Sequence, residues 1–590
     1  MLAIFSREFP DIPWENLGFQ VAPPRDPSHG DLTSNIAFVA SPHFRQAPRQ
    51  VATTLADVLN NNLTPASSIA VSGVAGPGFV NITLRPERKY DAERMGIREI
   101  LLADGRYGES SLGAGRRVNV EYVSANPTGP MHIGHCRGAV VGDALANLLA
   151  KAGYDVTKEY YINDAGAQIE ALAWAAYWRY LEAVGRPVPA ERFAEKLPGG
   201  LQYQGEYLIP VGQALAATYG PALVGEPPTD AAIAIVREFA VGKMMEAIRE
   251  DLALLGVVPD VFTSERGLVE SGAVDAAIGR LGEMGLIYEG TLEPPKGKLP
   301  EDWEPREQTL FRATLFGDET DRPLRKSDGT NTYFANDIAY HADKVGRGAE
   351  VLIDVWGADH GGYVRRMQAA VAALSARRVA LEVVLCQIVH VVRAGKPVRM
   401  SKRAGTYITL RELIEEVGRD AVRFTMLTRK ADAQMEFDLD QAVAQTRENL
   451  VFYVQYAHAR CRSVLRAAAE MLRAEGVGEP ATDEALAGVS LEALGAEPEL
   501  AVMRRLIAFP RTVEAAAEAR EPHRIAFFLY DLAGDFHILW NRGREDSTFR
   551  FLNPDRPAET CARVALVAAT AAVIRAGLNI LGVTPVEEMR

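Results

Sequence analysis

The hydrophobic and polar positions of the chain fall into three patterns, and the first covers residues 1–110. Residues 49–60 have helical spacing, and the segment 69–84, broken at Gly76-Pro77-Gly78, predicts two short strands. A charged segment at 86–102 predicts a helix with Pro86 in its first turn. We therefore expect residues 1–110 to form a small α+β domain.

The second pattern, over residues 111–440, is that of a parallel α/β domain. A strand is predicted at 118–123, followed by a loop, a helix at 134–152 and a second strand at 158–162. Two more apolar runs, at 352–356 and 383–390, predict further strands. Residues from about 185 to 260 contain helices with Pro and Gly clusters, so we predict an insertion between the halves of the domain.

In the third pattern, over residues 441–590, long Ala-, Leu- and Arg-rich helices predict an all-helical domain. A stretch near 474–500, rich in Ala, Gly and Glu, predicts an exposed connection. The apolar run 564–574 is shorter than the roughly 20 residues of a membrane-spanning helix, so it predicts a buried helix.

Composition and charge exclude several classes of protein. The chain has 590 residues, of which 48% are hydrophobic and 24% charged, as in globular proteins. Its net charge of −13 argues against nonspecific binding to nucleic acid or anionic membrane, although a local surface can still bind one RNA. The four cysteines include no C-x-x-C pair, and the N-terminus lacks the apolar core of a signal peptide. We expect a cytoplasmic protein that does not enter a membrane.

The strongest chemical signal follows the strand predicted at 118–123. A Pro- and Gly-containing loop, 126–130, leads into Met131-His132-Ile133-Gly134-His135. Two histidines three positions apart share one face of a helix start, where backbone N–H groups and the helix dipole favour phosphate. Gly134 allows a nucleotide to approach the backbone closely. The alternative is a helix that carries two surface histidines by chance, but the position after a strand and loop favours nucleotide binding.

A second basic segment is Arg399-Met400-Ser401-Lys402-Arg403, which follows a predicted strand and the turn 395–397. Lys402 offers a compact positive charge and Ser401 a hydroxyl to a triphosphate. Taken alone, a solvated basic turn explains this segment better. Together with the histidine motif far upstream, phosphate binding is the better explanation.

The two segments resemble the HIGH and KMSKS signatures of class I aminoacyl-tRNA synthetases, and the whole chain resembles the arginyl-tRNA synthetase family. The segments that carry this resemblance are VEYVSANPTGPMHIGHCRGAVVGDALANLL (120–149), YYINDAGAQI (160–169), TYFANDIAYH (332–341), VWGADHGGYVRRMQAA (355–370), FYVQYAHAR (452–460) and LNILGVTPVEEM (578–589). The chain departs from the KMSKS pattern at Arg399 and Arg403, whereas Lys402 is kept.

The resemblance implies a fold of three domains. These are an N-terminal α+β domain that contacts tRNA, a Rossmann-like α/β catalytic domain with an insertion, and a C-terminal all-α anticodon-binding domain. It also implies an arginine–tRNA ligase whose substrates are L-arginine, tRNA(Arg) and ATP, with Mg²⁺ accompanying ATP as co-substrate. No prosthetic group or protein metal site is implied, and a cytoplasmic monomer is expected.

The family motifs also imply a role for each matching position. Catalysis is assigned to His132, Gly134, His135 and Lys402. ATP binding is assigned to Pro130, Met131, Ile133, Gly357, Asp359, His360, Met400 and Ser401. Arginine binding is assigned to Glu121, Asn126, Tyr333 and Asp337, and tRNA binding to Phe79, Asn81, Tyr456, Arg460 and Trp540.

Structural explanations compete with several of these roles. Glu121 could be a solvent-exposed charge at a strand edge, Asp337 a helix cap and Phe79 a core residue. For each of the three candidates of the helical domain, Tyr456, Arg460 and Trp540, packing is the better explanation when the residue is taken alone.

Three other functions fit part of the sequence. A catalytically inactive synthetase-like tRNA-binding protein is opposed by the intact His132, His135 and Lys402. A class I synthetase for Cys, Gln or Glu is opposed by the lack of zinc-ligand cysteines and by the acidic residues at the arginine positions. A small nucleotidyltransferase is opposed by the long helical C-terminal part.

Overall fold

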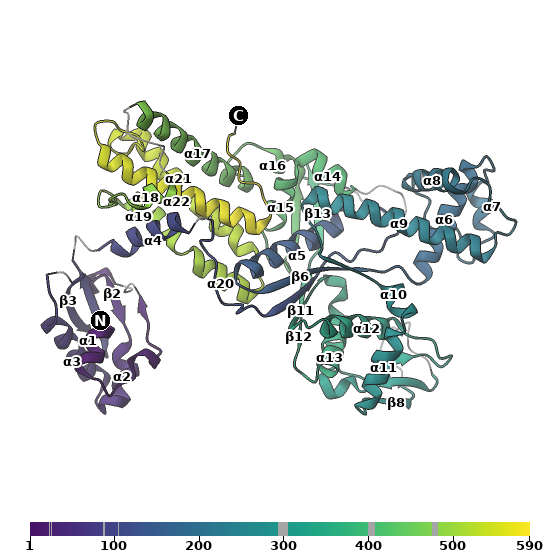
Figure 1. Cartoon of the computed structure of the whole chain (residues 1–590), viewed down its shortest axis with the longest axis horizontal. Helices are drawn as coiled ribbons and strands as arrows, with labels where there is room; N and C mark the ends of the chain where they lie inside the picture. The colour runs from purple at the N-terminus through teal and green to yellow at the C-terminus, as the bar shows by residue number, and fades with distance from the viewer. Residues whose placement is uncertain are drawn as a thin grey trace.

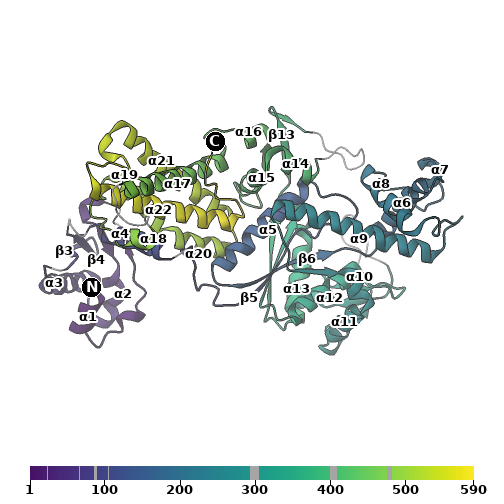
Figure 2. The ribbon, with the colours of Figure 1, turned by 45° about the horizontal axis from the view of Figure 1, so that its top comes forward.

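The fold was examined in a computed structural model. It describes residues 1–589 except 23, 25, 66, 86–88, 104, 293–304, 399–407 and 475–481. The N-terminal α+β unit lies at one end of the elongated molecule and a group of helices from the chain's middle at the other, in both views (Figures 1 and 2). A parallel sheet and a C-terminal helical unit lie between them.

The N-terminal unit packs helices on a four-stranded antiparallel sheet of order β1-β2-β4-β3. Its main elements are α1 (Leu2–Glu8), α2 (Ile36–Phe44), α3 (Pro48–Asn61), β1 (Val21–Ala22), β2 (Leu32–Ser34), β3 (Ile69–Ala75) and β4 (Phe79–Leu84). The predicted helix at 49–60 and the two predicted strands are thus confirmed. The helix predicted from Pro86 was placed too early, because α4 (Asp91–Leu102) begins at Asp91 and carries Asp91 and Glu93 in its first turn, where negative charge is favourable.

The centre of the molecule is a five-stranded, all-parallel sheet of order β12-β11-β5-β6-β7. Its strands are β5 (Arg117–Glu121), β6 (Asp155–Ile162), β7 (Val261–Ser264), β11 (Val351–Gly357) and β12 (Ala380–Cys386). Helix α5 (Ile133–Lys151) connects β5 to β6, as predicted. The chain proceeds from β5 outward through β6 and β7, then returns to β11 on the other side of β5. In such sheets, ligands bind at this reversal, beyond the carboxyl ends of the strands.

The single strand predicted at 383–390 is wrong. The chain forms β12 and then β13 (Val389–Arg393), which pairs with β14 (Lys396–Pro397) and β15 (Met435–Asp438) in a separate sheet. Between them the Gln387 N–H donates to the carbonyl of Ala431, and the Gln387 carbonyl accepts from Arg137. These tertiary hydrogen bonds redirect the backbone at Gln387, a single polar residue within an otherwise apolar stretch, which the pattern did not separate into two strands.

Helices fill the segment between β6 and β7 and form a hydrophobic cluster of their own. They are α6 (Ala167–Ala183), α7 (Ala190–Ala194), α8 (Ile209–Tyr219) and α9 (Asp230–Leu255). Helix α6 precedes residue 185 and packs against α8 and α9. The hydroxyl of Tyr207 donates to the carbonyl of Thr128 at 2.7 Å, so this helical group touches the loop before α5.

A second group of elements lies between β7 and β12. It contains α10 (Glu265–Glu270), α11 (Ala273–Glu283), α12 (Tyr333–Gly346), α13 (Val364–Leu374) and the small sheet of β8 (Ile287–Gly290), β9 (Gln308–Phe311) and β10 (Arg322–Arg325). Helix α12 supplies side chains that reach β5 and β11, so it covers one face of the central sheet.

The C-terminal part is helical, as predicted. Its helices include α17 (Leu450–Ala474), α18 (Asp483–Ala487), α19 (Glu497–Ile507), α20 (Phe509–Ala519), α21 (His523–Glu545) and α22 (Pro557–Leu581), preceded by α14 (Leu410–Val417), α15 (Arg419–Met426) and α16 (Leu439–Val443). The exposed connection predicted near 474–500 is wrong for its described part, because α18 packs against α4 and Leu486, Leu491 and Leu494 are buried.

Helix α22 contains the apolar run 564–574 and is a core helix. Among the described residues it is the one helix long and apolar enough to cross a membrane, but 83% of its most apolar window is buried inside the protein. The predicted buried helix is therefore confirmed, within a longer helix than the run alone suggested.

One fully buried arginine ties the central parallel sheet to the C-terminal helices. The Arg423 guanidinium donates to Asp143 of α5 at 2.5 Å and to the carbonyls of Leu255 and Leu581 at 3.0 and 2.9 Å. Because the guanidinium is planar and rigid, these three bonds fix the mutual positions of α5 and the ends of α9 and α22.

Candidate active site

The two histidines of the first motif lie together at the start of α5. His132 is the N-cap, and its Nδ1 accepts the Gly134 N–H at 3.0 Å, while Nδ1 of His135 accepts the His132 N–H at 3.3 Å. The two rings stack with centroids 3.9 Å apart. With Nδ1 accepting in both, the neutral tautomers carry their protons on Nε2. The start of α5 thus holds two imidazole N–H groups beside the positive end of the helix dipole, and Nε2 of His132 is buried.

Glycine is required at position 134 by the histidine itself. A Cβ atom on Gly134 would lie 2.8 Å from Cε1 of His132, too close for the ring to keep its place. The predicted ATP contacts at Met131 and Ile133 are restricted, because both side chains are buried in the core and only their backbone can reach a ligand.

Residues 408–410, downstream of the second motif, contact the first motif. The Met131 carbonyl accepts the Leu410 N–H at 2.9 Å, and His132 pairs with Thr409 in an isolated β-bridge. The predicted residues Met400, Ser401 and Lys402 lie outside the described residues, and the chain is described again from residue 408, where it is bonded to the histidine motif.

The turn after β5 is strained. Val123 and Ser124 have φ values of 72° and 40°, a region that β-branched residues such as valine rarely occupy. In this conformation the Ser124 hydroxyl donates to Glu121 at 2.8 Å and accepts the Tyr161 N–H at 3.0 Å. Asn126 is exposed and donates to Gln168 of α6 at 2.7 Å. Backbone strain of this kind concentrates at functional sites.

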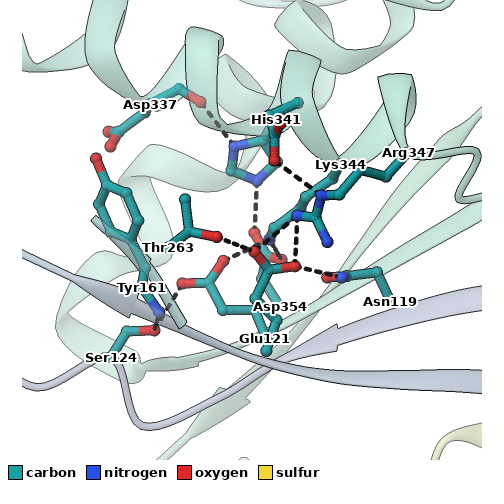
Figure 3. A network of polar contacts seen from close by, with 12 residues as sticks. Asn119, Glu121, Ser124, Tyr161, Thr263, Asp337, His341, Lys344, Arg347 and Asp354 are labelled. Atoms are coloured by element: carbon teal, nitrogen blue, oxygen red, sulfur yellow. Dashed lines mark hydrogen bonds and ion pairs between the residues drawn. The ribbon is translucent and has the colours of Figure 1, made fainter. Parts of the chain in front are cut away.

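A buried polar network fills the space between the sheet and α12 (Figure 3). Glu121 is 6% exposed, so it is not a solvent-exposed charge at a strand edge. The Lys344 ammonium lies 2.5 Å from Oε2 of Glu121 and 3.1 Å from Oδ1 of Asp354, and Nε2 of His341 lies 2.8 Å from Oδ2 of Asp354. Asp337, His341 and Lys344 reach this space because residues at intervals of three and four share one face of a helix.

The charges of this network are coupled through the buried lysine. Burial raises the pKa of Glu121, although the Lys344 ammonium opposes that rise. Burial would also raise the pKa of Asp354, but Lys344 and His341 outweigh it and lower that pKa. Glu121, His341 and Asp354 have the spacing of a metal site, yet the lysine ammonium already contacts both carboxylates in the position of a cation.

A second set of acidic groups lies at the carboxyl end of the sheet. Asp337 accepts the Tyr363 hydroxyl at 2.6 Å, and burial raises the pKa of Asp337 to about 6. It is not a helix cap, because Thr332 caps α12. Tyr333, one turn earlier on the same helix, is exposed.

Glu265 is a member of this set that the sequence did not reveal. It directly follows β7, is buried, accepts Nδ2 of Asn336 at 2.9 Å, and has a pKa that burial raises. Its place immediately after a parallel strand is the signal that could have identified it, but the short strand 261–264 was not predicted.

Comparisons with known proteins match the chain along its length. The family model for the arginyl tRNA synthetase N terminal domain matches residues 3–84, that for the tRNA synthetases class I (R) catalytic domain matches 96–182, and that for the DALR anticodon binding domain matches 454–589. The arginine–tRNA ligase of Gluconobacter oxydans is 61% identical over 97% of this chain and 93% of its own, and that of Ruegeria pomeroyi is 55% identical over 97% and 94%. The chain belongs to the arginyl-tRNA synthetase family. It is therefore an ATP-dependent arginine–tRNA ligase with a class I catalytic domain, and the inactive alternative is set aside.

The fold agrees with a solved arginyl-tRNA synthetase. The structure from Thermus thermophilus aligns with a TM-score of 0.64 over all of this chain and 98% of its own, at 21% identity. The predicted three-part architecture, with a parallel class I sheet and a helical C-terminal domain, is thereby confirmed.

The remaining positions predicted to bind ATP follow β11, the strand next to β5 on the other side of the point where the strand order of this synthetase reverses. Gly357 ends β11, and Asp359 and His360 follow in an exposed 3-10 turn, with His360 Nε2 3.7 Å from Asp359. Their side chains are open to solvent.

The positions predicted to bind tRNA form two groups in the synthetase. On β4, Phe79 is 39% exposed and packs edge-on against Phe38, which argues against a core role, and Asn81 accepts the Thr33 hydroxyl at 2.7 Å. In the helical domain, the Arg460 guanidinium lies 4.1 Å from the ring centroid of Tyr456 and 4.7 Å from that of Trp540. The structure thus brings these last three together from α17 and α21.

Proposed function

We propose that this ligase binds arginine in the acidic pocket at the carboxyl end of β5, β6 and β7 and binds ATP at the adjoining start of α5. The observation that carries the proposal is the convergence of Glu121, Asp337 and Glu265 at the carboxyl end of the sheet, the end at which α5 begins with the paired histidines. The arginine side chain has five N–H donors and no acceptor, so it needs carboxylates arranged around it.

The pocket divides the contacts to arginine among several residues. Asp337 and Glu265 face the guanidinium, with Tyr333 at the mouth of the pocket. Glu121 uses two of its roughly four acceptor positions for Lys344 and Ser124, and the others remain for substrate. Asn126, beyond the strained turn, binds the amino-acid end. Amino acids without a guanidinium leave these buried acids unpaired, which disfavours them strongly.

The phosphates of ATP bind the start of α5. His132 and His135 contribute their imidazole rings, Gly134 lets the phosphates approach the backbone, and Pro130, Met131 and Ile133 contribute backbone groups. Gly357, Asp359 and His360 face the adenosine, while Met400, Ser401 and Lys402 close on the triphosphate. Mg²⁺ accompanies ATP and offsets its negative charge.

The reaction has two steps. An arginine carboxylate oxygen bonds to the α-phosphorus as the bond to the β-phosphate oxygen breaks, giving arginyl-adenylate and pyrophosphate. A terminal ribose hydroxyl of tRNA(Arg) then attacks the arginyl carbonyl, loses its proton, and AMP leaves. The histidines and Lys402 stabilise charge that develops at phosphorus, and positioning supplies much of the remaining acceleration.

We also propose that the enzyme is a cytoplasmic monomer with domains 1–110, 111–440 and 441–590. Free cysteines, three of them buried, support a reducing compartment. Phe79 and Asn81 contact one part of the tRNA, and Tyr456, Arg460 and Trp540 contact the anticodon side.

Replacing Phe79 with alanine tests the N-terminal tRNA contact. Stacking of one base on an aromatic ring contributes enough that the KM for tRNA should rise roughly fivefold or more. The KM values for arginine and ATP should not change. The matched control is Val71→Ala on neighbouring β3, which is also exposed and should leave all three constants unaltered. An unchanged tRNA KM in Phe79→Ala would exclude this contact.

The raised pKa of Asp337 predicts a pH dependence for arginine binding. Only the ionised carboxylate pairs with the guanidinium, so the Kd for arginine should fall about tenfold per pH unit as pH rises toward 6 and level off above it. The contribution of Asp337 to folding stability changes with pH in the opposite direction, because it decreases as pH rises. The folded pKa exceeds the usual 3.8, so Asp337 favours the folded state below about pH 4, and this contribution is lost as pH rises through 6.

Calorimetric titration with arginine between pH 5 and 8 measures this dependence. Asp337→Asn should bind arginine weakly and with little change over the same range, while its affinity for ATP is kept. A wild-type Kd that is constant from pH 5 to 7 would remove Asp337 from the guanidinium pocket.

A further inference from the structure

The hydroxyl of Tyr161 has no hydrogen-bond partner within the described part of the chain, although the residue is only 5% exposed. A buried polar group without a partner costs stability, and nearly all buried polar groups in proteins are paired. Such a group at an enzyme site therefore calls for a partner that arrives with the substrate.

The tyrosine ring is held firmly in place. Tyr161 lies near the end of β6, its N–H donates to Ser124, and its ring stacks on Tyr340 with centroids 4.2 Å apart. The Lys344 ammonium lies 4.3 Å from the Tyr340 ring centroid, so the two rings rest on the buried network. Because the ring is fixed, the hydroxyl cannot turn to solvent for a partner.

The surroundings of the hydroxyl are acidic. Figure 3 shows the ring pointing toward the Asp337 carboxylate. Burial raises the pKa of Tyr161, and Asp337, Glu265 and Glu121 raise it further, in that order. The hydroxyl therefore stays protonated among three carboxylates and can both donate and accept.

A second unpaired acceptor lies in the same pocket. Asn336 donates through Nδ2 to Glu265, and its Oδ1 is buried without a partner among the described residues. Since a carboxylate accepts only, this bond fixes the orientation of the amide. The pocket thus holds more acceptors than donors, as a guanidinium requires.

We propose that Tyr161 determines specificity for arginine by accepting a hydrogen bond from a guanidinium N–H while its own proton turns to Asp337. This inference rests on the proposed function of the acidic pocket. The Tyr161 hydroxyl would thus contact the guanidinium as a neutral acceptor, in addition to the charged carboxylates. The direction of this contact is fixed because the tyrosine ring is fixed.

Tyr161→Phe tests the inference because it removes one oxygen atom and leaves the stacked ring. We expect the KM for arginine in tRNA charging to rise about tenfold or more, as for hydrogen bonds to charged groups. The KM for ATP should stay within about twofold of wild type. The melting temperature should be unchanged or higher, because the lost hydroxyl has no partner in the free enzyme.

Tyr180→Phe is the matched control. The Tyr180 hydroxyl is buried among the α6–α9 helices, donates to the Gly220 carbonyl at 2.6 Å and accepts the Leu223 N–H at 3.2 Å. Its loss should lower the melting temperature and leave the KM for arginine unchanged.

Two outcomes would overturn the role of Tyr161. One is an arginine KM within twofold of wild type in Tyr161→Phe, and the other is a lowered melting temperature with both KM values raised equally. Asp337→Asn separates the two hypotheses. If it raises the arginine KM and Tyr161→Phe does not, the pocket stands and only the tyrosine contact fails; if neither variant raises it, the pocket itself is refuted.

Discussion

Replacing His135 with alanine should slow arginyl-adenylate formation by roughly 10²–10³-fold, the usual effect of removing one preorganised donor to a charged transition state. The geometry explains why the loss is catalytic and not structural. His135 accepts the His132 N–H through Nδ1 at 3.3 Å, which places the proton of its neutral ring on Nε2, and the cap of α5 depends chiefly on His132. The KM for ATP should change much less than kcat, because the charge at phosphorus grows in the transition state.

Rapid-quench measurement of adenylate formation, with tRNA present, gives this rate directly. His135→Gln is the matched variant, since its side-chain amide keeps an N–H donor and should recover part of the lost rate. An ATP KM that rises tenfold while kcat is kept would show that His135 contributes to ground-state binding only.

The histidine motif could be predicted from the sequence because all of its parts are local. A strand, a turn and a helix within about 35 residues place His132 and His135 at the carboxyl edge of a parallel sheet, and the structure has this arrangement. The same local pattern could not show that the side chains of Met131 and Ile133 turn into the core. That depends on α14 and the strand-like pairing at Thr409, which lie far along the chain.

The buried network was missed because it is made by tertiary packing. Lys344 and His341 have the spacing of an ordinary polar helix face, which usually indicates solvent. In the structure this face of α12 packs on the central sheet. Glu121 of β5 and Asp354 of β11 lie opposite each other on adjacent strands there. The error at 383–390 has the same origin, since the hydrogen bonds of Gln387 to the Ala431 carbonyl and from Arg137 divide a run that is mostly apolar.

Lys344→Met should reduce the stability of the catalytic domain by about 3–5 kcal/mol, the usual cost of removing one partner of a buried ion pair. Lys344 is fully buried and contacts two carboxylates, so its loss leaves Glu121 without a counter-ion and Asp354 with His341 alone. Hydrogen exchange at the amides of β5 and β11 reports the free energy of local opening for this part of the fold. The matched control, Lys243→Met on the exposed face of α9, should change stability by less than about 0.5 kcal/mol.

The pH dependence of the stability loss in Lys344→Met shows whether the loss comes from uncompensated carboxylate charge or from the missing packing of the lysine side chain. Without the ammonium, burial raises the pKa of both carboxyls in the folded state, so they bind protons that the unfolded chain has released. Stability of Lys344→Met should therefore recover as pH falls from 7.5 toward 5. Adding Asp354→Asn should also restore part of the stability. The double variant should therefore lose less stability than the sum of the losses in the two single variants. A loss that is the same at both pH values and strictly additive would mean that Lys344 acts through the bulk of its side chain and does not hold Glu121 by charge.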